Sequence, residues 1–172
     1  MANRLEITLK STIPDPEGDG LRNKARAYFG LDIAGVRTVH VLTIDKPLSK
    51  DQLDTIRTEI FTNPVTQMSS YAPLSVPFDW NLWVGYRPGV RDNPGATAVE
   101  AVEDVLDVRF APGESIYTSR RYCIQSGELT RTEAEILAGE LLANDIIQQW
   151  RIFSREDWDP EEGIGLIIPK VI

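Results

Sequence analysis

Cysteine and histidine are almost absent from this sequence of 172 residues, which holds one of each, Cys123 and His40. A single cysteine excludes an intrachain disulfide bond and a cage of thiolate metal ligands. His40 stands in the middle of an expected strand, so we predict a structural or surface position for it rather than the role of a general base, which needs an orienting partner. Cys123 has no histidine near it in the sequence, and we predict a packed thiol.

Basic residues and long apolar runs are also scarce. Lysine and arginine number 18 against 26 aspartates and glutamates, for a formal net charge of −8. Nucleic acids and anionic membranes attract clustered basic residues, so we expect neither as a partner, and we expect the short Arg120-Arg121 run to be solvated or paired at the surface. The sequence has no apolar run of about 18 residues and no apolar core of a signal peptide. We therefore expect a cytoplasmic protein.

The motifs of common active sites are missing as well. The sequence has no glycine-rich phosphate loop, no dinucleotide-binding turn and no nucleophile elbow. The acidic residues 156–162 lack the glycine and the terminal glutamate of a calcium loop, so we expect a solvated linker. The apolar tail at 163–172 suggests docking on a partner or continuation into a longer chain. We predict no catalytic, cofactor-binding or metal-ligating residue, and no enzymatic activity of the chain by itself.

What the sequence does contain is an internal repeat. Alternating apolar residues predict a first strand in each copy: Leu5, Ile7 and Leu9, then, 77 positions later, Leu82, Val84 and Tyr86. Each strand leads into a helix start, Asp15-Pro16-Glu17-Gly18 or Asp92-Asn93-Pro94-Gly95, where aspartate accepts bonds from free backbone N–H groups and proline fits the first turn. The apolar stripes expected to face the core are Leu21, Ala25, Tyr28 and Phe29, matched by Ala98, Val102, Val105 and Leu106.

The second part of each copy repeats too. Long β-branched segments at residues 36–44 and 116–124 predict strands related by a shift of 80. Capping boxes at residues 49–52 and 130–133 each begin a second helix, at a shift of 81. These helices end at Asn63-Pro64 and Asn144-Asp145, where we expect the asparagine to cap the helix in left-handed backbone geometry. The helix caps match between the copies, and the spacing between equivalent residues changes mainly at a loop. Together these features indicate a duplication.

The duplication predicts how the chain is organised. We expect a first unit at residues 1–70, a linker at 71–79, a second unit at 80–154, and an acidic linker with the apolar tail at 155–172. Helices that return to one sheet face predict the α+β class, with two tandem ferredoxin-like βαβ(β)αβ units. Units of about 75 residues are marginal alone, so we expect a pseudo-twofold dimer within the chain. Trp83 is the candidate for the inter-repeat interface, because it points away from Leu82 and Val84; a partly exposed sheet edge is the alternative.

Two motifs of the second copy resemble the PurS family, the small subunit of bacterial phosphoribosylformylglycinamidine synthase. Residues 87–95 are similar to the family's Pro-Gly-Val-x-Asp-Pro-x-Gly loop, with Asn93-Pro94 replacing the usual order. Residues 141–147 are similar to its Leu-Leu-Ala-Asn-Pro-x-Ile helix end, with Asp145 replacing the proline. The first copy lacks Pro-Gly before Ile13 but keeps Asp15-Pro16-Glu17-Gly18 and Thr62-Asn63-Pro64-Val65.

The resemblance implies a PurS-like dimer in one polypeptide, as in the N-terminal region of the large single-chain enzyme. It implies a non-catalytic bridging subunit or domain that joins the synthetase (PurL-type) and glutaminase (PurQ-type) parts and assists ammonia transfer in purine biosynthesis. The partners would use the ATP and glutamine, and this chain would hold no cofactor. Two other functions stay open: a regulatory module that binds a small metabolite between its two copies, and a stand-alone enzyme that uses the cleft between them.

Overall fold

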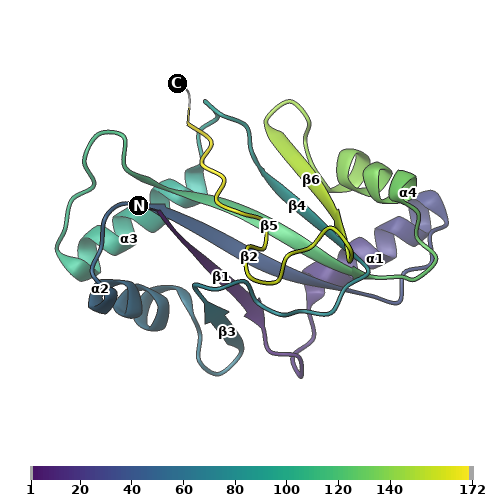
Figure 1. Cartoon of the computed structure of the whole chain (residues 1–172), viewed down its shortest axis with the longest axis horizontal. Helices are drawn as coiled ribbons and strands as arrows, with labels where there is room; N and C mark the ends of the chain where they lie inside the picture. Colours follow the sequence, from purple (N-terminus) through teal and green to yellow (C-terminus); the bar gives the residue numbers. More distant parts are fainter. Residues whose placement is uncertain (1, 171–172) are drawn as a thin grey trace.

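The computed structural model describes residues 2–170, and its elements follow one order twice. The first half contains β1 (Asn3–Leu9), α1 (Pro16–Phe29), β2 (Gly35–Asp45), α2 (Lys50–Thr55), its π-helical continuation η1 (Ile56–Phe61) and β3 (Gln67–Ser70). The second half contains β4 (Trp80–Tyr86), α3 (Asn93–Leu106), β5 (Ser115–Gln125), α4 (Arg131–Ile136), its π-helical continuation η2 (Leu137–Leu142) and β6 (Gln148–Ser154). The predicted α+β class is confirmed (Figure 1). No helix within residues 2–170 is long and apolar enough to cross a membrane.

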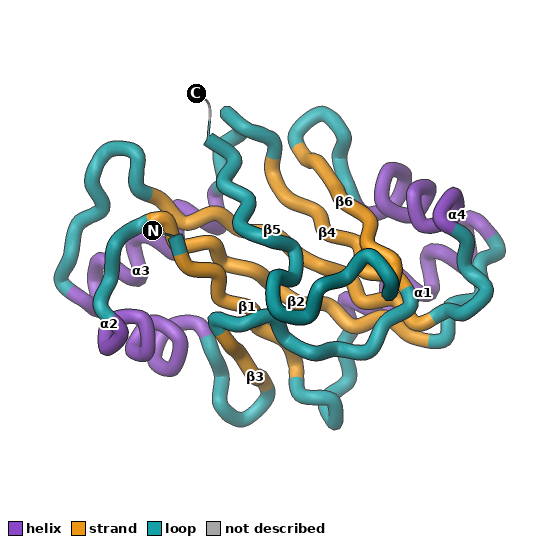
Figure 2. Tube along the Cα trace, in the orientation of Figure 1, coloured by secondary structure: helices purple, strands orange, loops and turns teal. Residues whose placement is uncertain are grey.

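The strands form one antiparallel six-stranded sheet in the order β3-β1-β2-β5-β4-β6. The two halves meet at the central pair, where β2 and β5 are aligned over the eleven residues of each strand. His40 lies opposite Arg120 at the midpoint of this register. The two residues that the repeat equates therefore face each other at the centre of the sheet, while β3 and β6 form its edges (Figure 2).

The helices cover one face of the sheet as two mixed pairs (Figure 1). Helix α1 packs beside η2 at one end of the molecule, and α3 packs beside η1 at the other. Ala25 of α1 consequently shares a core with Leu137 of the second half. Val102 of α3 shares another core with Ile56 of the first half. Each core is completed by side chains from the other half, so the two halves stabilise each other through burial of apolar surface.

Both first helices are fixed to the sheet by the same device, and the predicted aspartate caps are confirmed. Asp15 accepts a hydrogen bond from the Gly18 backbone N–H at 3.0 Å and a second from the Thr38 backbone N–H on β2 at 2.7 Å. The same bonds recur in the second half, from Gly95 to Asp92 at 2.8 Å and from Thr118 of β5 to Asp92 at 2.5 Å. Each aspartate therefore caps its helix and also holds that helix to a central strand.

Two glycines allow this close approach of helix to sheet. A Cβ atom on Gly18 would lie 2.1 Å from the carbonyl oxygen of Val36, and one on Gly95 would lie 2.1 Å from that of Ile116. These distances are far below van der Waals contact, so only a residue without a side chain fits there. The capping boxes predicted at residues 49–52 and 130–133 are also confirmed.

The stripe predicted for the first helices is right in their middle turns and for Leu106, which packs against a core cluster, and it is wrong for Tyr28, Phe29 and Val105. Leu21 and Ala25 are buried, whereas Tyr28 is 69% exposed. Val105 of α3, the residue matched to Tyr28, is exposed as well. Helices α1 and α3 begin near the middle of the sheet and end at opposite ends of the molecule (Figure 1). Their last turns reach beyond the central strands, so Tyr28 and Val105 lie where little of the sheet remains to be covered.

Coil covers the opposite face of the sheet. Residues 71–79 and the tail that follows β6 cross this face, and both contain no helix or strand (Figure 2). Leu74 of the first segment and Ile164 of the tail are buried in one cluster with Val39 and Trp83 of the sheet. The apolar tail, expected to meet a partner or to continue further, docks on the chain's own sheet through Ile164 and Ile167.

Candidate functional site

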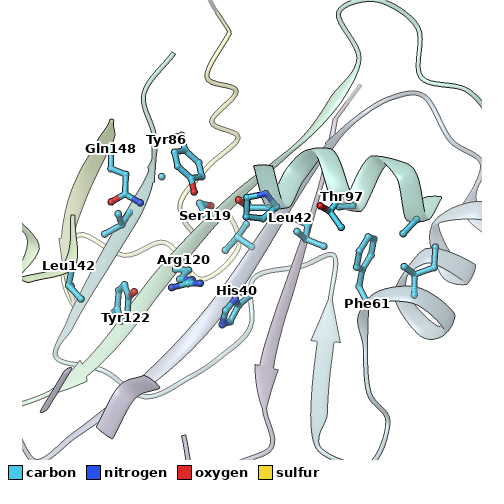
Figure 3. A pocket seen from close by; sticks show the side chains of 18 residues that line it. His40, Leu42, Phe61, Tyr86, Thr97, Ser119, Arg120, Tyr122, Leu142 and Gln148 are labelled. Atoms are coloured by element: carbon cyan, nitrogen blue, oxygen red, sulfur yellow. The ribbon is translucent and has the colours of Figure 1, made fainter. Parts of the chain in front are cut away.

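A groove of about 470 Å³ crosses the middle of β2 and β5 on the helix side of the sheet (Figure 3). Its centre is formed by His40 of β2 and Arg120 of β5, which come from different halves. One end is lined by Leu42 and by Phe61 of η1, and the other end by Tyr86, Leu142 and Gln148. The groove is therefore a joint product of both halves, with charged or titratable groups in the middle, apolar groups at the Phe61 end, and both polar and apolar groups at the Gln148 end.

Glu17 of α1 joins the two polar residues at the groove centre. Its Oε2 accepts a hydrogen bond from His40 Nε2 at 3.0 Å, and its Oε1 pairs with Arg120 Nη1 at 2.7 Å. The bond from His40 lowers the pKa of the Glu17 carboxyl; burial opposes this shift and the charge of Arg120 adds to it. The side chains of His40 and Arg120 are still 49% and 51% exposed. Both can therefore contact a ligand in the groove.

The two halves differ at this centre. Glu17 is the second residue of α1, and the second residue of α3 is the uncharged Pro94. The other groove-lining residues of α3 are Thr97, Ala98 and Ala101. One first helix thus supplies a carboxylate that pairs with the two central groove residues, and the other lines the groove with only small or hydroxyl-bearing side chains.

His40 lies in mid-strand, as expected, but it has the carboxylate partner that the sequence did not show. The contact depends on α1 lying over β2, which strand and helix patterns do not specify. A histidine beside a carboxylate is common in proton transfer. Here the carboxylate is also paired with Arg120, whose charge stabilises the ionised form and makes it a poor proton acceptor. The arrangement favours recognition of an anion over acid–base chemistry.

The expectation that Arg120 and Arg121 both lie at the surface is wrong for Arg121. Its side chain is fully buried on the opposite sheet face, where Nη2 donates to Glu6 Oε1 at 2.8 Å and to the Leu74 carbonyl at 2.5 Å. Glu6 is also fully buried and accepts a bond from the Leu74 backbone N–H at 2.8 Å. This ion pair connects β1, β5 and the linker. The alternation of a strand, which sends neighbouring side chains to opposite faces, is the signal that could have separated Arg121 from Arg120.

Trp83 is buried on the face of β4 opposite Leu82 and Val84. It belongs to one cluster with Val39 of the first half and Cys123 of the second, beneath the linker and the tail. Its side chain therefore lies where both halves and both covering segments meet. Its role as the inter-repeat interface stays a prediction.

Cys123 is a fully buried free thiol, and the predicted packed position is confirmed. Burial raises the pKa of this thiol to about 11, although the neighbouring Arg121 acts in the opposite direction. At neutral pH the sulfur is consequently protonated and shielded, and it has no nucleophilic role in the folded chain.

The acidic segment 156–162 is only in part the solvated linker that we expected. Asp157 pairs with Arg131 at 2.6 Å. Trp158 packs edge-on against Phe78 and Phe153, with the Arg121 guanidinium over its ring. The segment therefore anchors the tail to the sheet. Within residues 2–170, no group of three or more histidine, cysteine, aspartate or glutamate residues is placed to hold a metal ion.

Each edge of the sheet carries a loop with an exposed apolar residue. Val65, before β3, is 76% exposed, and Ile146, before β6, is 80% exposed. In the first loop Asn63 Oδ1 accepts from the Val65 backbone N–H at 2.9 Å, and the Asn63 N–H donates to Gln67 Oε1 at 2.8 Å. The second loop repeats both bonds: Ile146 to Asn144 at 3.1 Å, and Asn144 to Gln148 at 2.9 Å. We call these the two edge loops, residues 62–67 and 143–148.

A basic side chain from outside each edge loop donates a hydrogen bond to a backbone carbonyl within the loop. Lys10 Nζ donates to the Pro64 carbonyl at 2.7 Å, and Arg87 Nε donates to the Asp145 carbonyl at 2.8 Å. The left-handed geometry expected for the asparagines is wrong, because Asp107 is the one non-glycine residue with positive φ among those described. Side-chain bonds hold the loops, so the backbone needs no left-handed residue there.

Comparison with known proteins adds no relative: neither a scan against protein-family models nor a search of curated proteins finds a match. The resemblance of residues 82–153 to the PurS family therefore stays a prediction from its motifs. Both motifs have defined places in the fold. The first precedes and opens α3, and the second ends η2 and forms the edge loop before β6.

Proposed function

We propose that this chain is a non-catalytic bridging subunit, or the N-terminal domain, of phosphoribosylformylglycinamidine synthase. In this proposal it consists of two PurS-like units of the ferredoxin-like type, packed as an internal pseudo-twofold dimer. It joins the glutaminase and synthetase parts of the complex and assists the transfer of ammonia between them. The partners bind the ATP and glutamine of the reaction.

The observation that carries this proposal is the matched construction of the two edge loops. They contain the asparagine motif on which the resemblance depends, and each is closed by an asparagine, a glutamine and an external cation in corresponding places. The aspartate caps of α1 and α3 are matched in the same way. Because these bonds recur at equivalent positions of the two halves, they support two copies of one unit rather than a chance similarity in the order of strands and helices.

The position of the edge loops suits a bridge. A bridging protein needs two surfaces that can be occupied at the same time, and the loops precede β3 and β6, the two opposite edges of the sheet (Figure 2). Each loop holds its exposed apolar residue in a bonded frame, so little conformational entropy is lost when a partner covers it. The loops also differ, with Pro64 in one and Asp145 in the other, which allows two different partners to be distinguished.

The proposal predicts that the chain co-purifies with the glutaminase and synthetase subunits encoded in the same genome, with glutamine and nucleotide present. Val65→Asp and Ile146→Asp should each weaken binding of one partner by at least about tenfold and spare the other. Both side chains are mostly exposed, so neither change should lower the melting temperature much.

Val105→Asp is the matched control, because Val105 is an exposed valine on α3, outside both edge loops. It should leave both partners bound. The proposal is contradicted if the unaltered chain binds neither subunit under these conditions.

A further inference from the structure

The centre of the groove already binds one carboxylate, that of Glu17. Arg120 Nη1 lies 2.7 Å from one of its oxygens and His40 Nε2 lies 3.0 Å from the other. Two donors from different strands thus converge on an anionic group of this size. Hydrogen bonds between an arginine and a carboxylate or phosphate are among the strongest in proteins.

The Arg120 guanidinium keeps further donors besides the one that faces Glu17. A guanidinium has five N–H groups in a planar fork, and half of the Arg120 side chain is exposed. The groove therefore offers additional donors beside Glu17.

We propose that the groove binds a small metabolite through a carboxylate or phosphate group, and that this group takes the place of Glu17 at Arg120 and His40. The α3 side leaves room for it, since Pro94 and Ala101 stand where a symmetric chain would bring the equivalents of Glu17 and Lys24. The body of the ligand lies along the apolar end formed by Leu42 and Phe61. A groove of about 470 Å³ is in the range of small-molecule sites.

In this assignment Glu17 is an internal competitor of the ligand. It keeps Arg120 and His40 paired when the groove is free, and it must leave one or both of them when the anion binds. The anion is placed at Arg120 and His40, which belong to neither edge loop, so its binding can be measured on the chain without partner subunits, although Gln148 of the second edge loop lines the far end of the groove.

His40 makes the test direct, because it is the one histidine of the chain and gives a single set of imidazole signals in NMR spectra. The chain is titrated with inorganic phosphate and, separately, with L-glutamate, at fixed pH and fixed ionic strength. We expect a saturable shift of the His40 signals with at least one of them. Saturation with inorganic phosphate would indicate recognition of a phosphate group, and saturation with L-glutamate would indicate recognition of a carboxylate.

Three variants give the expected effects. Arg120→Gln should weaken binding by at least about tenfold, since a charge-assisted bond is lost. Glu17→Gln should tighten binding several-fold, because it removes the competing charge. Arg109→Gln, at a side chain that is 82% exposed and outside the groove, should bind as the unaltered chain does.

Melting curves check that each variant is folded before its titration is used. No saturable His40 shift with either probe overturns the proposal. It is also overturned if Arg120→Gln binds as tightly as the unaltered chain, or if Arg109→Gln weakens binding as much as Arg120→Gln does.

Discussion

Replacing Arg121 with methionine will lower the free energy of unfolding by about 3–5 kcal/mol. The change leaves the fully buried Glu6 with only its longer, 3.4 Å ion-pair contact to Arg4 Nε, and it takes the donor from the Leu74 carbonyl. It also removes the guanidinium over the Trp158 ring, which helps to hold the tail. Because whole domains have a stability of about 5–15 kcal/mol, the loss should be large in urea denaturation followed by tryptophan fluorescence.

Two further variants make this result specific. Glu6→Gln combined with Arg121→Met should regain part of the loss, since position 6 is then uncharged, an amide oxygen can still accept the Leu74 N–H bond, and Arg4, which loses the Glu6 charge, keeps its bonds to the Glu162 and Gly165 carbonyls. Arg109→Met, at an arginine that is 82% exposed, should change stability by less than about 0.5 kcal/mol. A loss below about 1 kcal/mol for Arg121→Met would show that the pair is hydrated rather than buried.

Gly95→Ala will destabilise the fold by about 3 kcal/mol, the upper end of the usual cost of overpacking. The new Cβ would stand 2.1 Å from the Ile116 carbonyl oxygen, which is backbone of the central strand β5 and cannot turn aside. The helix must move away, and the bonds from Thr118 to Asp92 then lengthen. Gly18→Ala should have a similar effect, because its Cβ would meet the Val36 carbonyl at the same distance.

Gly20→Ala provides the control within the same helix as Gly18. Nothing lies within 4 Å of a Cβ at this position, so the change should stabilise the helix by about 0.5–1 kcal/mol. Thermal and urea unfolding of the three variants compare them directly. If Gly18→Ala and Gly20→Ala changed the free energy of unfolding by the same amount, the effect of both substitutions would be one of helix propensity, and the contact of Gly18 with the sheet would not matter.

Local features of the fold could be predicted from the sequence because they depend on near neighbours. The aspartate caps at Asp15 and Asp92 and the two capping boxes use residues within one helical turn. The burial of Cys123 was predicted from the apolar residues beside it. The exposure of Tyr28, Phe29 and Val105 was missed because a helical stripe shows which side is apolar and not where the sheet beneath it ends.

The remaining features depend on contacts between distant segments. The ion pair of Glu6 with Arg121 joins residues 115 positions apart, and the tail that covers it returns from the far end of the chain. The mixed helix pairs depend on which strands meet at the centre of the sheet, and strand patterns give no information on that choice. The groove also depends on this choice of central strands, because His40 and Arg120 become neighbours only when β2 pairs with β5.

The bridging function is tested most directly by reconstituting the amidation reaction. Glutaminase and synthetase subunits from the same genome are assayed for glutamine-dependent conversion of formylglycinamide ribonucleotide with ATP, with and without this chain. We expect glutamine-dependent turnover only when the chain is present, whereas an ammonium salt should support turnover in both cases. Equal glutamine-dependent turnover with and without the chain would contradict the proposal.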